Sequence, residues 1–264
     1  MGRGGLSFPV AVLAAALALS PVARADDAAA LGKACTAAAG QAAIDACTKL
    51  IDGGKLRAKY LAAAYFNRAL ANRKMSDEAK AAPDFLSAAN LGDGDSAFDL
   101  ANDYFDGNGV GRDPQQALIW YLAADRLGVK AAANEFAYQY DRGIGVGQDD
   151  SVAFKWYKKG ADGGHPMARK NLAVFYEHGR GTVKDIAKAL HYYALAAAAG
   201  VAGADNNLGQ LYLNGTDVPK DLTAAAKWFR AAADNGSREG ATSLGFLYER
   251  GQGVPKDLGE AMKW

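Results

Sequence analysis

The chain repeats a pattern of residue types every 36 residues, and this repetition limits the possible fold more than any other feature. Aspartate, glycine, tyrosine and a large aromatic residue each recur five times at this interval. The recurring residues are Asp113, Asp149, Asp185, Asp221 and Asp257; Gly107, Gly143, Gly179, Gly215 and Gly251; Tyr104, Tyr140, Tyr176, Tyr212 and Tyr248; and Trp120, Trp156, Tyr192, Trp228 and Trp264. A register held over five copies without an insertion is the signature of a stacked repeat array. Each unit of such an array buries its apolar face against its neighbours, so the core runs along the chain.

Each unit is predicted to form two helices. In the first unit, small or apolar residues stand at offsets of 0, 3, 4 and 7 residues from Ala97 and again from Ala117, which places them on one helical stripe. The recurring aspartate before the second helix suits an N-cap. A glycine at the end of each full unit suits a left-handed C-cap, at Gly128, Gly164, Gly200 and Gly236. The sequence therefore predicts an all-α solenoid of stacked antiparallel helix pairs, with units at 93–128, 129–164, 165–200 and 201–236 and an incomplete unit at 237–264.

The first 25 residues are predicted to be a signal peptide. A positively charged start is followed by an apolar run from Leu6 to Ser20, and Ala23-Arg24-Ala25 offers the small-x-small pattern of a cleavage site. A retained membrane anchor is the alternative, but the apolar run is short for a span, and no later stretch is long enough either. We therefore expect a periplasmic or secreted protein without stable membrane insertion after cleavage. The 30 Lys and Arg nearly balance the 29 Asp and Glu, which argues against a nucleic-acid partner.

Two cysteines, Cys35 and Cys47, lie near the predicted mature N-terminus. Cysteines of exported proteins are more often paired than free. The two stand on candidate helices at 28–39 and 41–51, and an antiparallel hairpin turning at Gly40 could bring them together. We predict a structural disulfide; a redox site would be expected to show a Cys-x-x-Cys pair, which is missing here.

Residues 26–92 are predicted to form a helical N-terminal cap. The stretch from Tyr65 to Gly92 resembles a tetratricopeptide repeat, with aromatic and small residues at the interface positions of that motif: Tyr65, Ala69, Ala81, Phe85 and Ala88. Asn72 replaces the usual aromatic residue. Pro83 falls inside the second helix, where the missing backbone donor predicts a kink or a late helix start.

Residues 93–264 closely resemble the Sel1-like repeat, a relative of the tetratricopeptide repeat. The shared pattern is A-x-x-L-G/A-x-x-Y-x-x-G-x-G-V-x-x-D-x-x-x-A-x-x-W-Y/F-x-x-A-A-x-x-G. Individual copies depart from it at Phe136, Thr182, Asp217 and Tyr192. The resemblance implies an extended right-handed superhelix that presents a concave face to a protein or peptide. Many such proteins are exported bacterial proteins that regulate signalling, envelope processes or host contact.

No catalytic, metal-binding or cofactor-binding residue is predicted. The glycine-rich loops at 107–111 and 143–147 look like nucleotide-binding loops, but they follow helices and recur five times, which favours turns with positive φ. Capping explains all five periodic aspartates, and we assign the periodic tryptophans to core packing. His165, His178 and His191 occupy different positions of the unit and have no metal-ligand spacing.

Non-repeating polar residues on the first helix of each pair are the candidates for binding. The first helices line the inner face in related repeats, and their exposed positions are predicted to include Asn102, Asn134, Tyr138, Asp141, Lys170, Glu177, Asn206, Gln210 and Glu249. The alternative for any one of these residues is that it simply faces solvent.

These observations favour a non-enzymatic scaffold or regulator of the bacterial cell envelope that binds a protein or peptide, for instance an envelope sensor or a wall-modifying enzyme. The first alternative is an enzyme that binds or hydrolyses β-lactams, as proposed for cysteine-rich members of the family; those carry cysteine pairs within each repeat, and this array has none after Cys47. The second alternative is a passive role in envelope structure.

The fifth unit stops at Trp264, whereas the fourth continues from Trp228 to Gly236. We expect a frayed final helix with a partly uncovered indole, or a natural protein longer than this chain.

Overall fold

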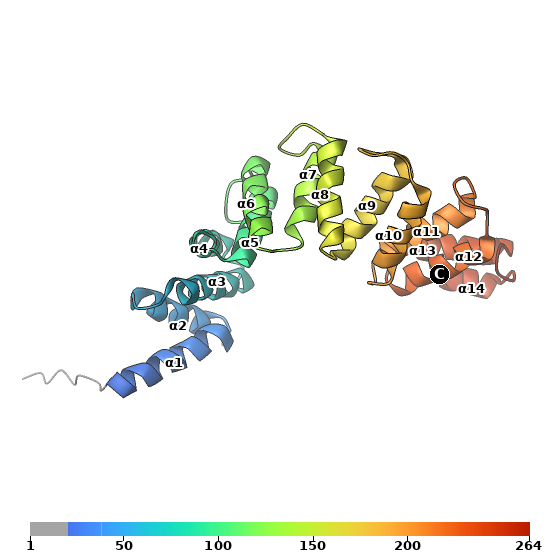
Figure 1. Ribbon diagram of the computed structural model, residues 1–264. Coiled ribbons are helices and arrows are strands. Elements are labelled where there is room, and N and C mark those ends of the chain that lie inside the picture. The colour runs from blue at the N-terminus through green and yellow to red at the C-terminus, as the bar shows by residue number, and fades with distance from the viewer. Residues whose placement is uncertain (1–20, 38) are drawn as a thin grey trace, which may run out of the picture.

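The computed structural model describes residues 21–37 and 39–264, and over these residues it contains only helices and their connections (Figure 1). The first twenty residues of the predicted signal peptide therefore lie outside the described part. The helices are α1 (Pro21–Ala37), α2 (Gln41–Asp52), α3 (Ala58–Lys74), α4 (Glu78–Asn90), α5 (Gly94–Asp106), α6 (Pro114–Arg126), α7 (Ala132–Arg142), α8 (Asp150–Asp162), α9 (Pro166–His178), α10 (Ile186–Ala197), α11 (Ala202–Asn214), α12 (Leu222–Asp234), α13 (Arg238–Arg250) and α14 (Leu258–Lys263).

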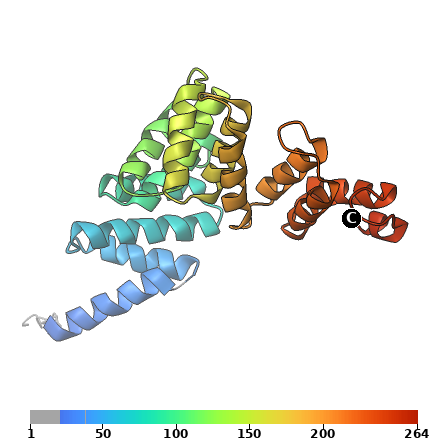
Figure 2. The same cartoon turned by 45° about the vertical axis from the view of Figure 1, so that its right-hand side comes forward.

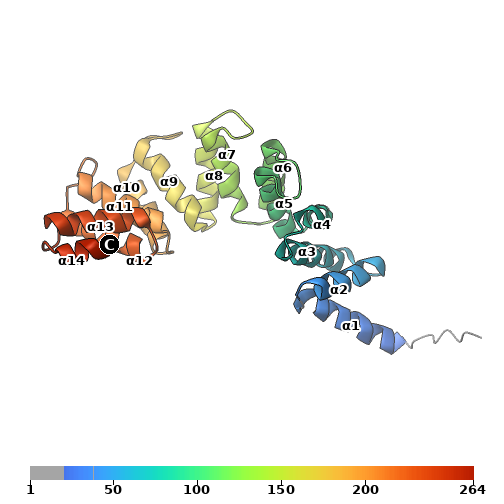
Figure 3. The ribbon, with the colours of Figure 1, turned by 180° about the vertical axis from the view of Figure 1, so that it is seen from behind.

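Each helix packs against the helices before and after it in the sequence, so the pairs stack in chain order. Figures 1 and 2 show this order running from α1 at one end of an elongated, curved array to α14 at the other, and Figure 3 shows it from behind. The predicted all-α solenoid is confirmed. Its core is correspondingly divided into a series of clusters along the array instead of one central core.

The first helices of the pairs form the inner side of the curve. The most extensive contacts between helices two positions apart join α1 to α3, α7 to α9 and α11 to α13, and all six are first helices of their pairs. Units of a curved array approach one another most closely on the concave side. The face predicted to bind a partner is thus the face on which neighbouring units meet directly.

The periodic aspartates and glycines act as helix caps. Each of the five aspartates is an N-cap whose carboxylate accepts one or two backbone N–H groups of the following helix. The five glycines that follow the first helices adopt φ between 67° and 87° as left-handed C-caps. Capping by the aspartates and positive φ at the glycines are therefore confirmed.

The second glycine of each G-x-G loop has a further role, because the loop lies against the preceding unit. At Gly181, with φ of 62°, an added Cβ would overlap the carbonyl oxygen of Asp150 at the start of α8. Gly253 approaches Leu222 at the start of α12 in the same way. In the fourth unit Asp217 replaces this glycine, and its carboxylate pairs with Lys184 of the preceding unit at 2.5 Å.

In each of the first four units a fully buried aromatic residue stands one position after the periodic large aromatic residue. Tyr121, Tyr157, Tyr193 and Phe229 are at most 2% exposed. Trp120, Trp156 and Trp228 also pack against the core clusters but stay partly exposed. The prediction that the tryptophans contribute to packing is right, but the centre of each unit is filled by the following residue.

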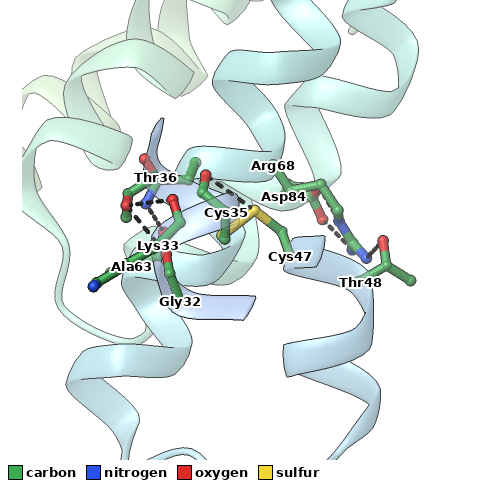
Figure 4. Close-up of a disulfide and its surroundings, with 10 residues drawn as sticks. Gly32, Lys33, Cys35, Thr36, Cys47, Thr48, Ala63, Arg68 and Asp84 are labelled. Atoms are coloured by element: carbon green, nitrogen blue, oxygen red, sulfur yellow. Dashed lines mark hydrogen bonds and ion pairs between the residues drawn. A yellow bond between two sulfur atoms is a disulfide. The ribbon is translucent and has the colours of Figure 1, made fainter. Parts of the chain in front are cut away.

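A disulfide joins the first two helices (Figure 4). Cys35 of α1 and Cys47 of α2 are both buried and are linked as predicted, with a Cα–Cα distance of 4.8 Å. Nearby, the guanidinium of Arg68 in α3 donates two 2.7 Å hydrogen bonds to Asp84 of α4 and one of 3.0 Å to Thr48 of α2. The first pair is therefore closed covalently, and the Arg68 side chain connects it to the second pair.

Two expectations at the ends of the array have different outcomes. Helix α4 begins at Glu78 and continues through Pro83, so a late helix start is wrong; the N-cap Asp77 already fixes the start by accepting the N–H of Lys80. At the other end, Trp264 is partly exposed and donates its indole N–H to Glu260 at 3.1 Å. Fraying of α14 stays a prediction.

Candidate functional site

All nine residues predicted for the inner face lie on first helices. Asn102 is on α5, the next three are on α7, and the others follow on α9, α11 and α13. Eight of them are partly or fully exposed. Asn134 is only 4% exposed, so its prediction as an exposed position is wrong. It is buried because its amide is bonded on both sides within the wall of a pocket.

Four of the nine residues line one pocket between α7 and α9, which we call the α7–α9 pocket. Its volume is about 290 Å³. The lining residues are Asn134, Glu135, Tyr138, Asp141 and Arg142 of α7, Tyr157 of α8, and Met167, Lys170 and Asn171 of α9. The second and third units both contribute, so the pocket exists only because the two units are stacked.

A chain of hydrogen bonds runs along the pocket wall in one direction. The Lys170 amine donates to Asn171 Oδ1 at 3.2 Å, Asn171 Nδ2 donates to Asn134 Oδ1 at 3.0 Å, and Asn134 Nδ2 donates to Glu135 Oε1 at 2.9 Å. The chain partly satisfies the Glu135 carboxylate at one end. At the other end it uses one of the three protons of the lysine amine.

Two cations of the pocket have no carboxylate partner. Among the described residues, neither Lys170 nor Arg142 forms an ion pair. The Arg142 guanidinium lies 5.7 Å from the centre of the Tyr138 ring. Burial, together with the nearby charge of Arg142, lowers the pKa of Lys170. The ammonium form of Lys170 is therefore less favoured in the pocket than in water.

The carboxylate of Asp141 already has partners within the protein. It accepts from the Arg180 guanidinium at 2.6 Å and from the Tyr157 hydroxyl at 3.2 Å. Arg180, from the third unit, also pairs at 2.5 Å with Asp150, which like Asp141 belongs to the second unit. On the opposite side, burial raises the pKa of Glu135. The positive character of the pocket thus gathers around Lys170 and Arg142.

Two other predicted residues accept hydrogen bonds from buried tyrosines. Tyr121 donates to Asn102 at 2.7 Å, and Tyr193 donates to Glu177 at 2.6 Å. In the fourth unit the positions equivalent to Tyr193 and Glu177 hold Phe229 and Leu213, so donor and acceptor are replaced together. These polar residues on the inner face therefore satisfy the hydroxyls of the core.

The remaining three predicted residues lie away from the pocket. Asn206 and Gln210 are on α11, and the side-chain oxygen of Asn206 is buried without a hydrogen-bond partner among residues 21–37 and 39–264. Glu249 lines a different, mostly apolar hollow of about 500 Å³ beside Phe246, Met262 and Trp264.

The nine predicted residues do not include Glu135, Arg142 and Asn171 of the same pocket. The signal that could have found the first two is their spacing from Tyr138, because residues three and four apart share a helix face. Asn171 stands 37 residues after Asn134, close to one repeat length, which is the spacing at which side chains of neighbouring units meet.

No chemistry for metal binding appears in the described part of the chain. No group of three or more His, Cys, Asp or Glu side chains there could hold a metal ion. His165 caps α9 by accepting the N–H of Ala168 at 3.3 Å, and His178 contacts its own helix through the carbonyl of Val174. None of the helices between residues 21 and 264 is long and apolar enough to cross a membrane.

The repeat units match a known family model, that of the Sel1 repeat. It matches residues 94–129, 130–165, 166–201, 202–237 and 239–264, which is well over half of the chain. The chain belongs to the Sel1 repeat family. In the first four copies the matched segments begin one residue after the units predicted from the sequence. Sel1 repeats are typical of scaffolds for protein–protein interaction.

Solved structures similar to this Sel1 repeat protein support the fold. A protective antigen present in uropathogenic Escherichia coli strains, which displays an SLR fold, has a TM-score of 0.76 and 26% identity over 91% of this chain and 52% of its own. The present chain thus spans about half of that protein. A Sel1 repeat protein from Oxalobacter formigenes has a TM-score of 0.71 and 26% identity over 84% of this chain and 96% of its own.

A more distant structure is similar in fold alone. This immunity protein from Pseudomonas aeruginosa has a TM-score of 0.52 and 21% identity over 77% of this chain and 79% of its own. A comparison with curated proteins found no similar sequence.

Proposed function

We propose that this protein is a non-enzymatic scaffold or regulator of the bacterial cell envelope that binds a protein or peptide segment along its concave face. The observation that carries the proposal is the α7–α9 pocket, where four independently predicted residues from two units converge. A core does not need these side chains to be polar and different from unit to unit. A surface that recognises one particular partner does need polar side chains that differ between units.

The proposal includes an exported location. Residues 1–25 have the charge, apolar run and cleavage pattern of a signal peptide, and a disulfide joins Cys35 to Cys47 soon after them. Mass spectrometry of the protein purified from a Gram-negative periplasm should find a chain that begins at Asp26. An unprocessed chain retained in the cytoplasm would contradict export.

Affinity capture tests the binding face. The Tyr138→Ala variant removes a partly exposed aromatic ring from the pocket, and Lys155→Ala and Lys227→Ala, which change exposed residues of the second helices, serve as controls. A partner identified with the wild type should be lost or strongly depleted with Tyr138→Ala and retained with both controls. Equal capture by all four proteins would remove the pocket as the binding site.

The β-lactamase alternative has no support from a specific feature. The one cysteine pair lies in the N-terminal cap and is buried, so the repeat units carry no disulfide of the kind on which that alternative rests.

A further inference from the structure

The charge distribution of the α7–α9 pocket points to the chemistry of its ligand. Lys170 and Arg142 line the same hollow without an ion pair among the described residues, whereas Asp141 is paired with Arg180. Two like charges close together in a partly buried site are unfavourable unless an anion lies between them. Glu135, the other carboxylate of the pocket, forms no ion pair with either cation among the described residues, so both can pair with an anion supplied by a ligand.

The donors are free to bind that anion. The Lys170 amine donates one hydrogen bond, to Asn171, and the Arg142 guanidinium lies over the Tyr138 ring and donates none among the described residues, so both keep N–H groups for a ligand. A carboxylate is the anion of a peptide that matches these donors, because charge-assisted hydrogen bonds of this kind are short and strong. The ring of Tyr138 and the exposed side chain of Met167 supply apolar contact beside them.

The position of the pocket distinguishes a side chain from a chain end. The pocket lies between the second and third of five units, and the inner face continues over α5 on one side and over α11 and α13 on the other. A segment bound along this face passes the pocket in the middle of its course. It would present a side chain there, and the volume of about 290 Å³ has room for one residue with its flanking backbone.

We propose that the α7–α9 pocket binds the side-chain carboxylate of an aspartate or glutamate within an acidic peptide segment, held by Lys170 and Arg142. This proposal rests on the scaffold function above and names the chemistry of its partner. Bound carboxylate would also favour the ammonium form of Lys170, whose pKa burial and Arg142 lower in the free pocket.

Calorimetric titration of the purified full chain tests the proposal with defined probes. The first is an acetylated and amidated decapeptide of alternating glycine and glutamate; the second replaces glutamate with glutamine; the third is the glutamine peptide with a free terminal carboxylate. We expect the glutamate peptide to bind at least about tenfold more tightly than the glutamine peptide. Its affinity should fall as salt is raised, because part of the attraction is screened.

Variants assign the effect to the pocket. Lys170→Gln should weaken binding of the glutamate peptide roughly ten- to a hundredfold, the range for a lost hydrogen bond to a charged group. Arg142→Gln should act in the same direction. Lys155→Gln, an exposed lysine of α8, should leave the affinity unchanged. Equal binding of the glutamate and glutamine peptides, equal loss with Lys170→Gln and Lys155→Gln, or binding of the free-terminus probe alone would each overturn the proposal.

The two proposals fail in different ways. A captured partner that is lost with Tyr138→Ala but kept with Lys170→Gln would leave the scaffold function standing and remove the carboxylate. A partner kept with both variants would remove the pocket altogether.

Discussion

Replacing one buried glutamine should stabilise this protein. Gln139 lies on α7 with 0% of its surface exposed, and within the described part of the chain neither its side-chain nitrogen nor its side-chain oxygen has a hydrogen-bond partner. The equivalent positions of the fourth and fifth units hold Leu211 and Leu247, both buried. In the first unit the same position holds Asp103, which pairs with Arg73 at 2.6 Å. Gln139 thus has neither the apolar side chain nor the ionic partner of its equivalents.

The expected gain follows from the cost of an unsatisfied buried group. Leaving one such group unpaired costs about 1–3 kcal/mol, so Gln139→Leu should raise the free energy of unfolding by about 2 kcal/mol. With a urea m-value of about 3 kcal/mol/M, the midpoint of unfolding should rise by about 0.7 M. Trp156 reports on the same unit by fluorescence, since its ring lies 4.3 Å from that of Phe136 on α7. Hydrogen exchange of α7 and α8 should slow most, because stability in a repeat array is largely local.

Two further variants make the test decisive. Gln210→Leu changes the same atoms on α11 where the side chain reaches solvent, and it should alter stability by less than about 0.5 kcal/mol. Leu211→Gln creates the proposed defect in the fourth unit and should cost at least about 2 kcal/mol. A Gln139→Leu protein no more stable than the wild type, with Gln210→Leu neutral, would show that the amide is satisfied in solution and that the reasoning is wrong.

Three other perturbations have defined outcomes. Burial lowers the pKa of His165, and its neutral ring caps α9, so the folded state binds fewer protons than the unfolded state and stability should fall as pH drops below about 6.5. In a series of urea midpoints measured at different pH values, His165→Asn should flatten this fall. An unchanged slope would exclude this role of the His165 cap. Gly181→Ala should lower thermal stability by about 2 kcal/mol, because the added methyl group meets both a positive φ and the backbone of Asp150 at the start of α8. Gly147→Ala, where the added methyl group lies in open space, should be neutral. Similar losses in both variants would refute the contact between Gly181 and Asp150. Tyr193→Phe should lower the free energy of unfolding in urea by about 1 kcal/mol. Adding Glu177→Leu should restore part of this loss, because the fourth unit holds an apolar pair at the two equivalent positions. Additive losses would contradict the coupling between Tyr193 and Glu177.

The repetition made most of the fold predictable because a residue that recurs five times is sampled in five local contexts. Capping by Asp113 and its equivalents, and positive φ at Gly107 and its equivalents, depend on backbone geometry that each unit repeats. The start of α4 depends on the cap at Asp77, which a proline rule applied to Pro83 alone does not consider.

The candidate site was predictable only in part because its contacts cross between units. Helical spacing gives the face on which Tyr138 and Asp141 lie, but it does not show that Asn171 of the next unit reaches Asn134 and buries it. The lack of an ion pair at Lys170 among the described residues likewise depends on the distance to every neighbouring helix. Such information is carried by the packing of units and not by the pattern within one.

The fit of each G-x-G loop onto the preceding helix start has a consequence for how genes of this kind can change in length. Loss of a single codon between Gly181 and Asp185 would move either the loop off Asp150 or the cap off α10, since both ends of the segment are fixed. Loss of codons 166–201 would instead join equivalent positions and preserve both kinds of contact. Inherited length changes should therefore come in steps of one whole unit, and each step would lengthen or shorten the inner face by the width of one helix pair.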